Sequence, residues 1–225
     1  MAPTFSDFYA QQIQADLDWR ETELAVLRRH LLSTTIGSTQ EVTFLRTNLA
    51  MIYAHYEGFC KFALGIYVDA LTALSLTPID LKWPIAVQSF RKLQAELKSI
   101  DTPADFFSKL LTEFETKLTE PANYERPDNV ANLWPDLLSS WLDRFNLDST
   151  AVSQEKARLD TLVNSRNQIA HGKKLTVANR TELDLHANAA TLAMHAVAIG
   201  VMDALEQRRY ARNSRVMTIL SHAMH

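Results

Sequence analysis

The chain has 225 residues, of which 47% are apolar and 22% are charged, and its formal net charge is -3. These values are typical of a globular protein with a substantial core, and they exclude one that binds nucleic acid over its whole surface, because such proteins are strongly basic. One cysteine excludes an internal disulfide, and five scattered glycines leave no glycine-rich loop for a nucleotide phosphate.

Apolar residues recur at steps of three and four positions almost throughout the chain, which predicts an all-α fold. A first helix is expected over about 6–32, followed by a break at 33–39. A second helix, over about 40–75, has the most regular apolar side. We expect this long second helix to be the centre of a helical bundle.

The remainder of the chain predicts shorter elements and one more long helix. Thr102 and Pro103 form a typical helix start, and the composition of residues 120–132 is that of a loop. Asn188 and Asp203 interrupt the most apolar stretch, so it predicts a core helix and no membrane span. We expect these further helices over about 85–100, 103–119, 133–146, 149–171 and 179–210.

The sequence shows no internal repeat and no linker that separates two units. We therefore predict a single domain over residues 1–225, with a variable helical insertion over about 76–130 and a basic tail over about 206–225. The single cysteine fits a reducing compartment, and the amino terminus does not have the pattern of a secretory signal. These features favour a cytoplasmic location.

Charge is uneven along the chain. Residues 164–180 contain four bases and no acid, whereas residues 101–128 contain seven acids and three bases. The basic segment is the strongest candidate for a local nucleic-acid site. From its charge we infer that Lys173, Lys174 and Arg180 contact an RNA backbone.

Common catalytic and metal-binding motifs are absent. The sequence has neither HExxH nor GxSxG, and no pair of close histidines is accompanied by a carboxylate at the spacing of metal ligands. Cys60 lies among apolar residues, as a buried thiol does, and Glu57 and Lys61 have the i,i+4 spacing of a helix-surface pair. We expect no metal and no cofactor.

The heptapeptide at 166–172, RNQIAHG, combines residues suited to phosphoryl chemistry. Arg166 can hold a phosphate, and His171, one residue before a glycine at a predicted helix end, can exchange a proton near neutral pH. Asn167 and His171 share one helix face, but Arg166 and His171 diverge by about 140°. The arginine must therefore curl around the helix, or a second copy of the chain must complete the site across a two-fold axis.

RNQIAHG resembles the R-N-x-x-x-H motif of the HEPN superfamily of all-α dimeric domains. A second segment, residues 44–71, is similar to the long second helix of a HEPN-like nuclease group related to the RiboL-PSP-associated branch. Within it, residues 53–59 read Tyr-Ala-His-Tyr-Glu-Gly-Phe, a pattern characteristic of that group. The two matches occur in the expected order, and residues 76–130 carry little resemblance.

The resemblance implies a metal-independent endoribonuclease that acts as a homodimer and leaves a cyclic phosphate and a 5′-hydroxyl. It implies that Arg166 and His171 are the catalytic pair and that Asn167 orients them. His55 and Glu57 match the second segment as auxiliary residues, with helix packing and a surface pair as the alternative interpretations.

Family analogy further implies a toxin of a toxin–antitoxin or antiphage defence system, with RNA, for example tRNA, as substrate and a cognate antitoxin as partner. The alternative is a non-catalytic HEPN-like module that binds a nucleotidyltransferase or another protein. Retention of the arginine, the asparagine and the histidine favours the enzyme.

Overall fold

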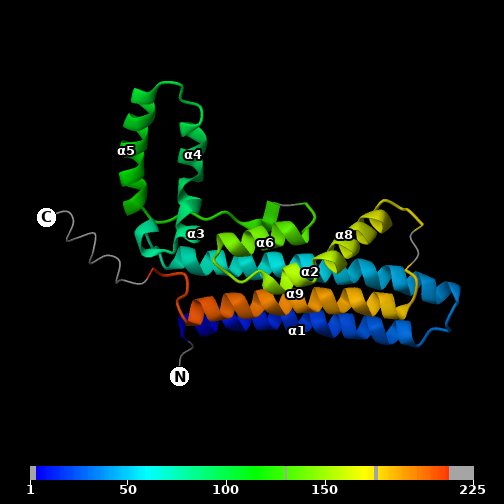
Figure 1. Cartoon of the computed structure of the whole chain (residues 1–225). Helices are drawn as coiled ribbons and strands as arrows, with labels where there is room; N and C mark the ends of the chain where they lie inside the picture. Colours follow the sequence, from blue (N-terminus) through cyan, green and yellow to red (C-terminus); the bar gives the residue numbers. More distant parts are fainter. Residues whose placement is uncertain (1–3, 130, 175–176, 213–225) are drawn as a thin grey trace.

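The computed structural model describes residues 4–129, 131–174 and 177–212, and the described residues are helical apart from turns, loops and one isolated bridge. The predicted all-α helical bundle is therefore confirmed. The three long helices are α1 (Phe5–Leu32), α2 (Thr39–Ala73) and α9 (Arg180–Glu206). They lie side by side, with α1 antiparallel to the other two (Figure 1).

The second helix is the centre of the bundle, as its sequence pattern predicts. It packs against α1, α8 and α9, and eighteen of its residues are buried. Each large apolar side chain removed from water contributes roughly 1.5–3 kcal/mol. The hydrophobic core therefore follows α2 along almost its whole length.

One glycine lets α1 approach α2 closely. A Cβ atom at Gly58 would lie 2.7 Å from Nη1 of Arg20, which is held on α1 by an ion pair with Asp16. Because the guanidinium occupies the space that a side chain would need, a larger residue at this position would displace it. The glycine of the 53–59 segment thus has a packing role.

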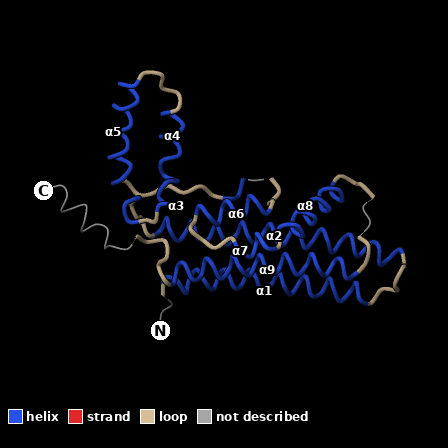
Figure 2. The backbone as a smooth tube through the Cα atoms, in the orientation of Figure 1, coloured by secondary structure: helices blue, strands red, loops and turns tan. Residues whose placement is uncertain are grey.

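Residues beyond α2 form the peripheral helices α3 (Trp83–Ala86), α4 (Arg91–Leu97) and α5 (Pro103–Thr119). The α4–α5 pair stands out from the bundle as a hairpin (Figure 2). The start of α5 agrees with the predicted one. The single helix expected over about 85–100 is instead α3, a 3-10 turn over 87–90 and α4, because the chain bends there around the end of the bundle.

The second half of the chain carries α6 (Pro135–Arg144), α7 (Thr150–Gln154) and α8 (Lys156–Ala170), of which α8 packs against α2 and α7 packs against α9. One helix was expected over about 149–171, and this expectation is wrong in one respect. The helix breaks at Glu155, whose φ of -94° and ψ of 8° depart from helical values. The break separates α7 from α8, the helix that carries RNQIAHG.

By length and composition, α9 is the one described helix that could cross a membrane. It lies in the bundle against α1, α2, α7 and α8, with eleven buried residues that include Leu183, Val197 and Val201. This packing is that of a core helix.

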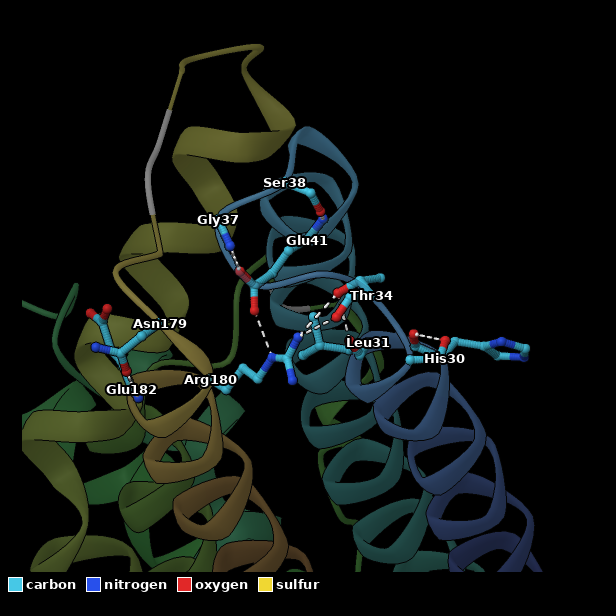
Figure 3. Close-up of polar contacts among 10 residues, drawn as sticks. His30, Leu31, Thr34, Gly37, Ser38, Glu41, Asn179, Arg180 and Glu182 are labelled. Atoms are coloured by element: carbon cyan, nitrogen blue, oxygen red, sulfur yellow. Dashed lines mark hydrogen bonds and ion pairs between the residues drawn. The ribbon is translucent and has the colours of Figure 1, made fainter.

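A cluster around Arg180 joins the α1–α2 turn to the start of α9 (Figure 3). The guanidinium donates to Glu41 Oε1 at 2.6 Å and to the Thr34 carbonyl at 2.9 Å, and the other oxygen of Glu41 accepts the Gly37 amide at 2.6 Å. The hydrogen bond from Gly37, with Arg180 beside it, lowers the pKa of the Glu41 carboxyl. Two segments that are 139 positions apart at Glu41 and Arg180 are thereby fixed together.

We expect Arg180→Ala to lower the midpoint of thermal unfolding by about 5 °C, because it leaves Glu41 and Thr34 without their shared donor. The matched control is Arg28→Ala. Arg28 forms a bidentate ion pair with Asp184, but 52% of its side chain is exposed, and its loss should cost less than about 3 °C. Equal losses in a thermal melt would contradict a special role for Arg180.

Candidate active site

The arginine of the RNQIAHG motif points from α8 onto α2. Its Nη2 donates to Glu57 Oε2 at 3.1 Å, and its guanidinium carbon lies 4.0 Å from the centre of the Tyr53 ring. Only 28% of the Arg166 side chain is exposed. Tyr53 and Glu57 are one helical turn apart, so α2 presents an aromatic face and a carboxylate to the same guanidinium.

Two asparagines complete the surroundings of this arginine. Nη1 of Arg166 donates at 3.1 Å to Oδ1 of Asn132 and, also at 3.1 Å, to Oδ1 of Asn167. We refer to Arg166, Tyr53, Glu57, Asn132 and Asn167 as the Arg166 cluster. Its residues come from α2, α8 and the loop before α6, so the cluster exists only in the folded chain.

The loop that carries Asn132 is held by the same tyrosine. The backbone N–H of Leu133 donates to Tyr53 Oη at 3.0 Å, next to Asn132, whose φ of 56° is left-handed. Asparagine tolerates this conformation better than most residues. Burial raises the pKa of Tyr53 to about 12, so its hydroxyl stays protonated near neutral pH. Tyr53 is therefore suited to positioning rather than to proton transfer.

The carboxylate of Glu57 binds two cations, one with each oxygen. Oε2 accepts from Arg166, and Oε1 lies 2.8 Å from Nζ of Lys61, one turn further along α2. The expected pair of Glu57 and Lys61 thus exists, but only 16% and 19% of these side chains are exposed, and the pair extends to the motif arginine. Glu57 therefore fixes Arg166. The carboxylate, the guanidinium and the ammonium group of Lys61 together carry one net positive charge.

His55 lies on the other side of α2 from this cluster. Its ring packs edge-on against Trp19 of α1, and its Nε2 lies 2.8 Å from Glu23 Oε2. Burial, opposed by the charge of Glu23, lowers the pKa of His55, which favours the neutral ring. The two auxiliary candidates therefore do not meet: Glu57 contacts Arg166, and His55 lies in the α1–α2 interface.

His171 follows the last residue of α8, and its backbone N–H donates to the Asn167 carbonyl at 3.0 Å. The imidazole is exposed and makes no hydrogen bond with the described residues. Gly172 follows with a φ of 71°, a left-handed helix end that glycine adopts without strain. Arg166 faces α2, whereas the exposed imidazole of His171 lies at the carboxyl end of α8.

Of the three residues inferred as RNA contacts, two are exposed and one is engaged. Lys173 and Lys174 are exposed just after the motif. Nη2 of Arg46 on α2 donates to the Lys173 carbonyl at 3.1 Å, so the backbone of the loop is fixed there. Arg180 is held in its own cluster with Glu41 and Thr34, and its charge is countered within the chain.

Tyr53, Asn132 and Arg46 were not among the site residues predicted from the sequence. Tyr53 had a signal, because it precedes Glu57 by one helical turn inside the 53–59 segment. Asn132 and Arg46 had none, since each reaches its partner only through folding. Within the described residues, no three or more His, Cys, Asp or Glu side chains are arranged to hold a metal ion, and burial raises the pKa of the Cys60 thiol.

The sequence was compared with known families and proteins. The family model for MAE_28990/-like HEPN matches residues 9–210, which include most of α1 and all of α2, the Arg166 cluster and α9. No curated protein and no solved structure shows significant similarity to the chain.

We expect Tyr53→Phe to reduce the free energy of unfolding by about 1–2 kcal/mol, because it leaves the buried N–H of Leu133 without an acceptor. The variant keeps the aromatic ring of residue 53 against the guanidinium of Arg166. Tyr67→Phe is the matched control, since the buried Tyr67 hydroxyl has no hydrogen-bond partner among the described residues, and its removal should change stability by less than about 0.5 kcal/mol. Urea denaturation of both variants tests this difference, and equal effects would contradict it.

Proposed function

The chain belongs to the MAE_28990/-like HEPN family, and on this basis we propose that it is a metal-independent endoribonuclease that uses Arg166 and His171. The observation that carries the proposal is the guanidinium of Arg166, which is held on several sides while 28% of the arginine side chain remains exposed. A fixed, partly exposed cation is suited to a phosphodiester, because it needs no reorganisation as charge develops. An ionisable histidine ends the same helix.

In the proposed reaction, the 2′-hydroxyl of a nucleotide attacks the adjacent phosphorus atom. The bond from phosphorus to the 5′-oxygen breaks, which leaves a 2′,3′-cyclic phosphate and a 5′-hydroxyl. A base takes the proton of the 2′-hydroxyl, and an acid gives a proton to the departing 5′-oxygen. Arg166 binds a non-bridging oxygen, and His171, at the negative end of the α8 dipole, is suited to the role of acid.

A single chain offers one motif histidine, and the reaction needs both an acid and a base. We propose that two copies pair with their α8 ends together, so that the second copy supplies the other histidine. The opposite directions of Arg166 and His171 support this arrangement, since His171 is left free for a neighbour. Asn167 then orients Arg166 through the 3.1 Å contact, and Lys173 and Lys174 contact the RNA backbone.

Under this proposal the biological role is that of a toxin in a toxin–antitoxin or antiphage defence system, with RNA as substrate and a cognate antitoxin or a nucleotidyltransferase as partner. We do not assign Arg180 to RNA, because its Nε donates to Glu41 and its Nη2 donates to Thr34. The basic tail contributes Arg208, Arg209 and Arg212 within the described residues, and Arg215 lies outside them.

We expect the purified protein to cleave a labelled structured RNA in EDTA with cyclic-phosphate product ends, and we expect His171→Ala to lower the rate by at least about 100-fold, since it removes a proton-transfer group. Product ends are identified by their sensitivity to acid hydrolysis and phosphatase. An all-2′-deoxy strand should remain intact, because it has no attacking hydroxyl.

The matched control for His171→Ala is His30→Ala, another histidine near the end of a long helix and far from the motif in sequence. Cleavage at equal rates by wild type and His171→Ala would refute the assignment. Absence of cleavage by wild type on total cellular RNA would favour the non-catalytic binding module instead. Light scattering adds a second criterion, because a strict monomer at the assay concentration would exclude the two-copy site.

We also expect Glu57→Ala to lower kcat for RNA cleavage by about 10-fold or more, because Arg166 loses the acceptor that fixes it, while Glu57→Gln should keep part of the rate by retaining a hydrogen-bond acceptor. Asp69→Ala is the control: it removes an exposed carboxylate of the same helix that pairs with Arg126. A wild-type kcat for Glu57→Ala would show that the contact with Arg166 has no part in positioning.

A further inference from the structure

The α4–α5 hairpin contains an apolar groove that no other part of the described chain fills. It has a volume of about 380 Å³. Apolar side chains form both walls: Phe90, Leu93 and Leu97 on one side, and Phe106, Leu110 and Phe114 on the other. Because the hairpin stands away from the bundle (Figure 1), the main core does not reach this groove.

The exposure of α5 shows that, among the described residues, no element covers the outer face of the hairpin. None of the seventeen residues of α5 is buried, although the helix is amphipathic. Phe114 is 37% exposed on the groove side. A globular chain does not usually leave such a surface in water, and a continuous apolar patch of this kind marks a binding site.

The described chain ends close to this groove. The guanidinium of Arg212 lies 4.2 Å from the centre of the Trp83 ring, and its backbone N–H donates to the Asp80 carbonyl at 2.8 Å. A second hydrogen bond, from the Lys82 N–H to the Tyr210 carbonyl at 2.9 Å, flanks an isolated antiparallel β-bridge between Leu81 and Ala211. Trp83 begins α3, and Val87, four residues later, lines the groove. The chain therefore leaves the fold at the base of the hairpin.

The thirteen residues that follow, 213–225, lie outside the described residues, and their sequence has the pattern of an occupant for such a groove. Six apolar residues recur at helical spacing, and on a helical wheel they fall within an arc of about 160°. Thr218, Ser221, His222 and His225 fall on the opposite side. The apolar residues are Val216, Met217, Ile219, Leu220, Ala223 and Met224.

The length of the segment is sufficient for this role. Thirteen residues span about 20 Å as a helix and up to about 45 Å when extended, against about 26 Å for the seventeen residues of α5. Attachment at Arg212 also gives the segment a high effective concentration at the hairpin, of the order of millimolar for a short tether. A separate partner would have to bind the groove strongly enough to compete with this effective concentration.

We propose that residues 213–225 of the same chain dock as an amphipathic helix into the groove between α4 and α5. The segment covers the apolar walls and converts the hairpin into a three-helix unit. The proposal concerns a surface distinct from the Arg166 cluster, and it stands whether or not the protein cleaves RNA.

The test uses disulfide formation in the full-length protein. Cys60 is fully buried, so two introduced cysteines are the reactive pair. Gln94→Cys lines the groove, and Leu220→Cys lies in the middle of the apolar pattern. The control pair replaces Gln94→Cys with Lys92→Cys on the same helix, where 88% of the side chain is exposed outside the groove.

Under mild oxidation of dilute protein, we expect a disulfide within one chain for the groove pair, at least about 10-fold faster than for the control pair. Peptide mass spectrometry of a mixture of isotopically light and heavy protein distinguishes bonds within a chain from bonds between chains. Bonds between chains would overturn the proposal in favour of a second copy as the occupant. Equal rates for the two pairs, or no bond in either, would also overturn it.

Hydrogen exchange gives an independent measurement. A chain that ends at Arg212 should exchange the amides of residues 91–119 at least about 10-fold faster than the full chain, while α2 and α9 keep their protection and so report that the truncated chain is folded. Unchanged exchange in 91–119 would mean that the segment does not cover the hairpin.

Discussion

An arginine can be withdrawn from water only where acceptors meet its donors and its charge is countered. For Arg166 that requirement falls mainly on α2, which supplies a carboxylate from Glu57 and an aromatic face from Tyr53. The opposite side of the same helix receives α1, which Gly58 allows to come close. Residues 53–59 thus take part in two interfaces, one with α1 and one with α8. The position of α8 on the bundle depends on the second of these interfaces.

The contacts of Tyr53 join the motif to a loop that lies more than thirty residues before it in sequence. Its ring supports Arg166, and its hydroxyl accepts the Leu133 amide. The left-handed backbone of Asn132 then directs an amide oxygen at the same guanidinium. Because each contact presupposes the others, the arginine orientation is a property of the folded core and not of α8 alone.

Helical spacing in the sequence was sufficient to predict the long helices and the start of α5, because burial of one face and proline at a first turn are local signals. The break at Glu155 has no such signal, since neither glycine nor proline marks it. Charge counting likewise could not distinguish Lys173 from Arg180, whose partner Glu41 lies 139 positions away. The motif located the candidate site, but the residues that hold Arg166 became visible only with tertiary contacts.

The length of α2 determines how the two surfaces of this molecule relate. Glu57 lies at its middle, and the hairpin is attached beyond its last residue, Ala73. Sixteen residues of helix separate the two points, a distance of about 24 Å. The hairpin groove and the Arg166 cluster are therefore separate surfaces of the molecule. Two routes of packed helices connect the groove to Arg166, one along α2 and the other from α3 through α6 to α8, so a shift or tilt of these stiff elements is the way in which an occupant of the groove would act on the arginine.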